Sequence, residues 1–152
     1  MEQRVSLVTL GVSDLERARE FYRSLGWTPG PSPEHIAFFQ TGGMVVALWE
    51  RAALAVDSGI DIADDTEDTP GSGDTWGGKL LGLNVASAAE VDEQLADAQQ
   101  AGATVLRDPC TRFWGGYSGV FTDIDGHVWE IAYNPYWTVT EDGRTLLGDG
   151  RG

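Results

Sequence analysis

The sequence has 152 residues and a single cysteine, Cys110, so no disulfide can form within the chain. A lone thiol fits a reducing compartment, and we interpret Cys110 as buried filler in preference to a reactive thiol. No apolar run approaches the roughly 20 residues that a membrane-spanning helix needs. The N-terminus, MEQRVSLVTL, lacks the basic start and apolar core of a signal peptide. We therefore expect a cytoplasmic protein.

Basic residues are also scarce. Ten Lys and Arg stand against 24 Asp and Glu, which gives a net charge of -14. Nucleic acids and anionic membranes are bound through Lys and Arg, so this balance argues against both as partners. Seven of the acidic residues lie between Arg51 and Lys79 with no basic residue among them. Because Gly, Ser and Thr are also frequent there, we predict that residues 52–78 form a solvated acidic connector.

The first part of the chain has the pattern of a strand, a helix and a hairpin. The β-branched run VSLVTLGV at residues 5–12 predicts a strand. Ser-x-x-Glu at residues 13–16 is a capping box that predicts a helix, and Gly26 can end that helix. Residues 35–40 and 44–50 predict two strands joined by a Gly-Gly turn.

The same order recurs after the connector. Residues 80–85 predict a strand, and Ser-Ala-Ala-Glu at residues 87–90 is a second capping box, which begins a helix that Gly102 can close. A short strand at residues 104–107 and a loop follow. A hairpin around Asp125-Gly126 completes the second set of elements.

The repeated order predicts an internal duplication of a β-α-β-β-β module. We predict an α+β fold with a first module in residues 1–51, a second in residues 79–135, and a C-terminal extension in residues 136–152. In one such module the helix covers one face of the sheet and leaves the other face bare. Two modules can bury the bare faces against each other or curl them around a shared cleft.

The last strand of the second module carries one charged side chain at its centre. Side chains alternate along a strand, so Val128, Glu130 and Ala132 share one face. Glutamate is depleted in strands, and an unpaired buried charge is costly. Water, a hydrogen bond, a metal or a ligand could compensate for the charge of Glu130, and the sequence leaves all four open.

The segments VTLGVSDLERAREFYRSLGW and DIDGHVWEIAYNP resemble the vicinal oxygen chelate superfamily. This group includes glyoxalase I, bleomycin-resistance proteins, extradiol dioxygenases, methylmalonyl-CoA epimerase and fosfomycin-resistance enzymes. Together with the second capped helix, the resemblance covers nearly the whole chain except the connector and the tail. It implies a glyoxalase-like fold, in which two paired βαβββ modules form a cupped mixed β-sheet with flanking helices. It also implies a homodimer.

Metal-dependent members of that superfamily bind a divalent ion with up to four side chains, two from each module. Glu130 matches one of these positions, whereas Leu7, Ala47 and Leu80 stand at the other three. Leu and Ala offer no lone pair to a metal ion. We therefore expect no divalent metal and no other cofactor. His127 has the opposite strand parity to Glu130, so we expect it to point away from that carboxylate and to have a structural role at the turn.

Without a metal, a ligand would be held by the inward-facing side chains. Trp49 lies on the inward face of its strand, and a glycine-containing loop brings Trp114 and Tyr117 near the sheet. We predict that these three residues and Glu130 bind a hydrophobic or aromatic small molecule, as in the metal-free bleomycin-resistance proteins. The alternative is an enzyme of the superfamily, a lyase, isomerase or dioxygenase with a depleted divalent metal site, in which Glu130 would be the catalytic residue.

Overall fold

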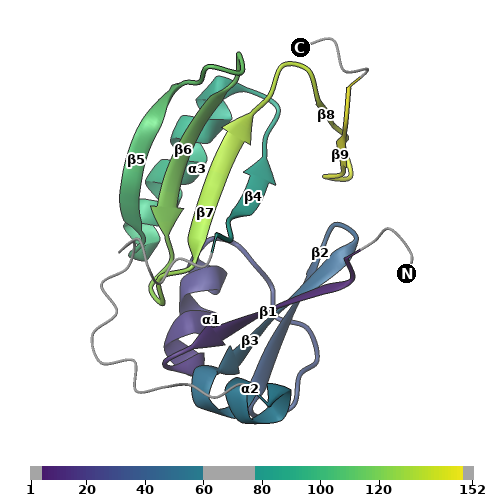
Figure 1. Cartoon of the computed structure of the whole chain (residues 1–152), viewed down its shortest axis with the longest axis vertical. Coiled ribbons are helices and arrows are strands. Elements are labelled where there is room, and N and C mark those ends of the chain that lie inside the picture. Colours follow the sequence, from purple (N-terminus) through teal and green to yellow (C-terminus); the bar gives the residue numbers. More distant parts are fainter. Residues whose placement is uncertain (1–4, 60–77, 149–152) are drawn as a thin grey trace. The chain divides into compact units, whose positions relative to one another are not determined.

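The computed structural model describes residues 5–59 and 78–148. The chain divides into two compact units, Met1–Thr75 and Trp76–Gly152 (Figure 1). Most of the predicted connector lies outside the described residues. Within those residues, no helix is long and apolar enough to cross a membrane.

The first unit is a three-stranded sheet with two helices. Its elements are β1 (Leu7–Val12), α1 (Leu15–Ser24), β2 (Ile36–Thr41), β3 (Met44–Glu50) and α2 (Arg51–Ser58). The strand order is β1-β3-β2, with β1 parallel and β2 antiparallel to β3 (Figure 1). The predicted hairpin around the Gly-Gly turn is confirmed.

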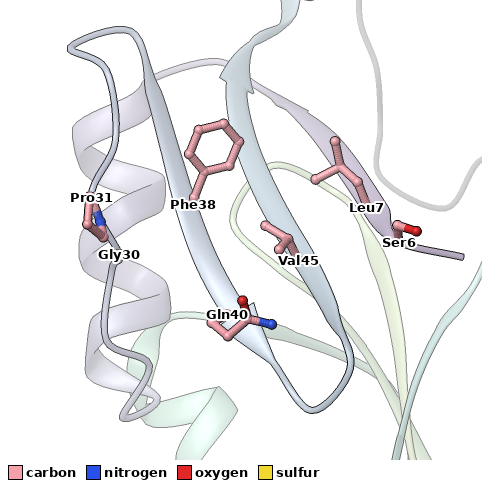
Figure 2. A pocket seen from close by; sticks show the side chains of 7 residues that line it. All are labelled: Ser6, Leu7, Gly30, Pro31, Phe38, Gln40 and Val45. Carbon is pink, nitrogen blue, oxygen red and sulfur yellow. The ribbon is translucent and has the colours of Figure 1, made fainter.

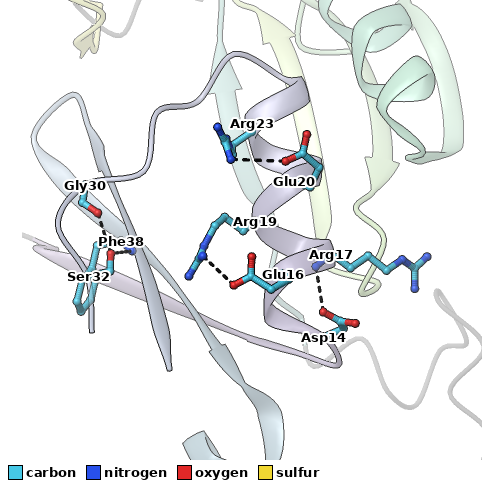
Figure 3. Close-up of polar contacts among 9 residues, drawn as sticks. All are labelled: Asp14, Glu16, Arg17, Arg19, Glu20, Arg23, Gly30, Ser32 and Phe38. Carbon is cyan, nitrogen blue, oxygen red and sulfur yellow. Dashed lines mark hydrogen bonds and ion pairs between the residues drawn. The ribbon is translucent and has the colours of Figure 1, made fainter. Parts of the chain in front are cut away.

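Helix α1 begins one residue later than the capping box predicted. Its N-cap is Asp14, whose carboxylate accepts a hydrogen bond of 3.0 Å from the backbone N–H of Arg17 (Figure 3). Ser13 was therefore the wrong capping residue, because the neighbouring Asp is an equally good cap. The outer face carries the ion pairs Glu16–Arg19 and Glu20–Arg23 (Figure 3). The inner face buries Leu15, Ala18, Phe21 and Tyr22.

Residues 51–58 form helix α2, although the sequence analysis placed nearly all of them in the connector. The helix ends at Gly59, which adopts the left-handed conformation with φ of 65°. The segment RAALAVDS is rich in Ala, the best helix former. The prediction of a connector over residues 52–78 rested on the charge and glycine content of the whole segment, and these do not reveal the short Ala-rich helix at its start.

The second unit repeats the order strand, helix, strands. Its main elements are β4 (Leu81–Asn84), α3 (Ala88–Ala101), β5 (Thr104–Thr111), β6 (Tyr117–Thr122) and β7 (Val128–Tyr133). The strand order is β4-β7-β6-β5, with β4 parallel to β7 and the other pairs antiparallel (Figure 1). Strand β5 is longer than predicted, and its pairing with β6 is interrupted by register shifts on both sides of Arg107.

Helix α3 begins as the second capping box predicted. Ser87 Oγ accepts a hydrogen bond from the backbone N–H of Glu90 at 3.2 Å, and the Glu90 carboxylate accepts one from the N–H of Ala86 at 3.1 Å. Gly102 ends the helix with φ of 108°. The buried side of α3 (Val91, Leu95 and Ala98) packs against the sheet, and a Cβ at Gly119 of β6 would lie 3.0 Å from Leu95.

A second hairpin forms the C-terminal extension. Strands β8 (Thr138–Val139) and β9 (Thr145–Leu146) pair antiparallel. They are joined by a turn in which Gly143 has φ of 80°. The turn predicted at Asp142-Gly143 is therefore confirmed. Ion pairing of Arg144 with Asp142, at 2.7 Å, stabilises it further.

Candidate functional site

Three polar side chains share the face of the second sheet that lies opposite α3. In the ladders, Glu130 of β7 pairs with Val120 of β6, which in turn pairs with Arg107 of β5. Ser118 is two residues from Val120 along β6. Directly paired residues and their neighbours two positions away lie on the same face of a sheet. The register therefore brings Arg107, Ser118 and Glu130 together.

These side chains form a closed hydrogen-bonded network. Ser118 Oγ donates to Glu130 Oε1 at 2.8 Å, and Arg107 Nη2 donates to the same oxygen at 3.2 Å. Arg107 Nη2 also donates to Ser118 Oγ at 2.8 Å. Ser118 is fully buried, whereas the side chains of Arg107 and Glu130 are each 28% exposed. Of the four kinds of compensation that the sequence left open for Glu130, the structure shows a hydrogen bond, and it adds an ion pair with Arg107 that was not among the four.

The network leaves two atoms without a partner. Both bonds to the carboxylate end on Oε1, and no bond to Oε2 forms within residues 5–59 and 78–148. Oε2 is not among the buried unpartnered atoms, so it is open to a small molecule. Arg107 Nε is buried and has no hydrogen-bond partner among the described residues.

Glu130 lines a pocket of about 680 Å³ in the second unit. The sheet contributes Gly82, Asn84, Glu130 and Ala132 to its floor, together with Leu80 just before β4. Segments outside the sheet contribute the aromatic residues Trp114, Tyr136 and Trp137. The volume lies within the range of 300–1,000 Å³ that is usual for small-molecule sites.

Trp114 is held over this pocket by the glycine loop between β5 and β6. The loop is closed by hydrogen bonds from Arg112 N to Gly116 O, at 2.8 Å, and from Gly115 N to Arg112 O, at 2.9 Å. The indole ring lies directly against Gly116, where a Cβ would overlap it. Gly115 has φ of 89°, which a residue with a side chain rarely adopts. The glycines therefore serve both the turn and the position of the indole.

Tyr117 is not among the residues that line this pocket, and its predicted role in ligand binding stays a prediction. It pairs with Tyr133 and so lies on the face that α3 covers. Its hydroxyl donates a hydrogen bond of 2.9 Å to the carboxylate of Asp92 on α3. That hydrogen bond, together with desolvation and the charge of Asp92, raises the pKa of Tyr117 above 10.0. Tyr117 belongs to the helix–sheet interface.

The first unit has a pocket of its own on its bare sheet face. The volume is about 420 Å³, and Leu7 from β1, Phe38 and Gln40 from β2, and Val45 from β3 line it (Figure 2). Trp49 lies on the same face as Val45 but is not among the lining residues. The prediction that Trp49 and Glu130 line one cavity joins residues of the two units and stays a prediction.

The side chains at the expected ligand positions do not fit a divalent metal ion. Counting along the parallel ladders, Leu7 and Leu80 are equivalent, and Ala47 is equivalent to Glu130. The apolar three have no donor, and Oε1 of Glu130 already accepts two hydrogen bonds. Among the described residues, no three or more His, Cys, Asp or Glu side chains are grouped so that they could hold a metal.

Comparison with known proteins identifies the family. The family model of the Glyoxalase/Bleomycin resistance protein/Dioxygenase superfamily matches residues 4–131. The chain belongs to this superfamily. No curated protein matches it. Both the resemblance and the glyoxalase-like α+β fold that the sequence predicted are therefore confirmed.

Solved structures of other proteins resemble this chain over most of its length. A glyoxalase-related enzyme from Fulvimarina pelagi is 34% identical, with a TM-score of 0.83, and the match covers 97% of this chain and 99% of that one. A hypothetical protein from S. aureus is 25% identical, with a TM-score of 0.70 over 88% of this chain and 95% of that one. A lactoylglutathione lyase from Agrobacterium tumefaciens, at 21% identity and a TM-score of 0.61 over 88% and 95% of the two chains, shares the fold.

Proposed function

We propose that this member of the superfamily binds a hydrophobic or aromatic small molecule, without a metal ion, in the pocket of the second unit. The observation that supports the proposal is one pocket with three aromatic side chains and one carboxylate whose partners are protein side chains. Aromatic walls with a few placed polar groups are typical of sites for planar or amphipathic ligands.

The polar groups of the pocket are few and serve to orient a ligand. Glu130 Oε2 can accept a hydrogen bond, and the amide side chain of Asn84 can donate and accept. Asn134 is less free, because its Oδ1 accepts a bond of 3.0 Å from the N–H of Tyr136. A flat ligand stacked on Trp114 would thus meet one strong acceptor at the floor of the pocket.

Arg107 supports the metal-free part of the proposal. A divalent ion beside Glu130 would compete with the guanidinium for Oε1 and would find no second carboxylate among the residues of this pocket. Placing it there would also bring two like charges together in a partly buried site.

The alternative is an enzyme of the superfamily, a lyase, isomerase or dioxygenase, with Glu130 as its catalytic residue. The 34% identical Fulvimarina pelagi protein is described as a glyoxalase-related enzyme, and this favours the alternative. A carboxylate base alone accelerates a reaction by roughly 10²–10⁴-fold. Binding without catalysis needs only the aromatic walls and hydrogen-bonding groups that this pocket contains. We therefore prefer the binding function.

We further propose that the protein acts as a homodimer in the cytoplasm. The resemblance supports the dimer, since the superfamily commonly completes its sites by pairing, and the lone cysteine supports a reducing compartment. Sedimentation equilibrium on the purified protein would measure the oligomeric state, and a monomer at tens of micromolar would contradict the dimer.

The main test combines elemental analysis with ligand screening. We expect freshly purified protein to contain far less than one divalent metal per chain and to show saturable quenching of Trp fluorescence by aromatic compounds, without turnover. Stoichiometric metal, or chemical conversion of a quenching compound, would contradict the proposal.

A pair of loop variants makes the binding test specific. Trp114→Ala removes one aromatic wall, and we expect affinity for a quenching compound to fall about tenfold or more. Phe113→Ala is the matched control, because Phe113 is the neighbouring residue, is 96% exposed and does not line the pocket. Equal affinity losses in the two variants would place the ligand elsewhere.

A further inference from the structure

The network around Glu130 bears on the charge of the ligand. We propose that Arg107 is a specificity-determining residue, which makes the pocket select an uncharged aromatic ligand with an N–H or O–H donor over a cationic one. This inference rests on the proposed function and names the ligand class of the same pocket.

The first step is the charge of the pocket. Within residues 5–59 and 78–148, Glu130 is the only Asp, Glu, Lys, Arg or His side chain that lines it. Arg107 is not among the residues that line the pocket, but it binds the carboxylate at 3.2 Å, and less than a third of either side chain is exposed. Solvent screens such a pair less than it screens a pair on the surface. The pair therefore brings the local charge near the pocket floor close to zero.

A carboxylate without Arg107 would favour a different ligand charge. Aromatic rings around an unpaired carboxylate would attract a cation through both the ring faces and the negative charge. Beside Arg107, the attraction of an incoming cation to Glu130 is offset by repulsion from the guanidinium, which lies 3.2 Å from Oε1. On binding, the cation would lose its hydration and gain little electrostatic stabilisation in exchange.

The third step concerns the hydrogen bonds that remain. Oε1 of Glu130 accepts from Ser118 and Arg107, which fixes the carboxylate and leaves Oε2 for a ligand donor. A neutral N–H or O–H can satisfy Oε2 without bringing an unpaired charge into the pocket. The buried Arg107 Nε has no partner among the described residues, so burial of the guanidinium carries a desolvation cost. A role of the positive charge in ligand recognition would account for that cost.

Three probes of nearly equal shape test the proposal: 2-naphthamide is neutral with N–H donors, 2-naphthamidine is a cation, and 2-naphthoate is an anion. Isothermal titration calorimetry at neutral pH would measure their affinities. For the wild-type protein we expect naphthamide to bind more tightly than naphthamidine. In Arg107→Gln the carboxylate loses its counter-charge, so the ratio of the two affinities should shift toward the amidine by about tenfold, as expected for one charge at close range.

Arg23→Gln is the matched control. Arg23 is 56% exposed and pairs with Glu20 on the outer face of α1, so the variant changes the net charge equally without touching the pocket. Its ratio of amidine to amide affinity should equal that of the wild type. A shift as large as that of Arg107→Gln would mean that total charge sets the preference, and would overturn the proposal.

A second variant covers the case in which Arg107→Gln does not fold. Glu130→Gln leaves the guanidinium without its carboxylate, so naphthoate should gain about tenfold while naphthamidine gains nothing. A wild-type preference for the amidine, or unchanged ratios in either folded variant, would overturn the role of Arg107 alone. If none of the three probes binds the wild-type protein, the proposed function fails as well.

Discussion

Gly116 offers a sharp test of how the pocket is built. Replacing it by Ala adds one methyl group at a position already occupied by the ring of Trp114. The added Cβ would also lie 2.5 Å from the backbone carbonyl oxygen of Tyr133 in β7. The indole can swing away, but the carbonyl belongs to a strand and can move only with the sheet. Both the pocket wall and the end of β7 must therefore shift.

The expected magnitude follows from overpacking. Forcing a methyl group into a filled site typically costs 1–3 kcal/mol, and in a protein of this size each kcal/mol lowers the melting temperature by about 2–4 °C. We expect Gly116→Ala to melt roughly 2–12 °C below the wild type. Because the indole is displaced, the affinity of the Gly116→Ala protein for aromatic probes should also fall, as we expect for Trp114→Ala.

Gly82→Ala is the control for the stability measurement alone, because Gly82 also lines the pocket. Gly82 lies in β4 on the same sheet, and a Cβ there would meet nothing within 4 Å. Since Ala restricts the unfolded chain, this variant should be unchanged or more stable by up to about 1 kcal/mol. Thermal denaturation followed by circular dichroism would measure both. If Gly116→Ala melts at or above the wild-type temperature, the position assigned to Trp114 is wrong.

Three further predictions concern single interactions. Asp14→Ala should destabilise the fold by about 1 kcal/mol in urea denaturation, whereas Asp14→Asn, which still caps α1, should lose only a few tenths. The pKa of Tyr117 is raised above 10.0. Its stabilising contribution is therefore present below pH 10.0 and lost as the pH rises through the raised value. Absorbance titration at alkaline pH should show this phenol ionising late, and Asp92→Asn should return it toward the ordinary range. Hydrogen bonds from Arg144 and Thr140 lower the pKa of Asp142 below 3.8. The contribution of this carboxylate to the β8–β9 turn should therefore be present above pH 3.8 and lost as the pH falls through the lowered value, and NMR of the Asp142 carboxyl carbon should follow this titration.

The elements of the fold were predictable because each has a local signal. Apolar alternation, turn glycines and capping residues depend only on neighbours within a few positions. These signals predicted β1, α3 and the hairpin of β6 and β7. Where two possible capping residues are adjacent, as Ser13 and Asp14 are, the local signal leaves the start of the helix uncertain by one residue. In the structure, Asp14 is the N-cap.

The face of Glu130 was predictable, whereas its partner was not. Strand parity alone places Glu130 opposite Trp129 and Ile131, whatever the rest of the sheet does. Its contact with Arg107 depends on how β5 pairs with β6, and that ladder shifts register on both sides of Arg107. A bulge moves a side chain to the other face without a marker in the sequence. The contact of Tyr117 with Asp92 likewise depends on its parity in β6, which its neighbours in the loop do not reveal.

The two modules share the same pattern of parallel strand pairing but have different side chains at equivalent positions. At equivalent positions the first unit has Thr9 beside Ala47, and the second has Gly82 beside Glu130. In the first unit, the positions equivalent to the superfamily's ligand positions hold Leu7 and Ala47, which have no donor atom for a metal. A carboxylate in mid-strand needs a counter-charge, and Arg107 of the same sheet provides it. Removing the arginine should therefore raise the affinity for cations in general, of which the naphthamidine gain in Arg107→Gln is the measurable case.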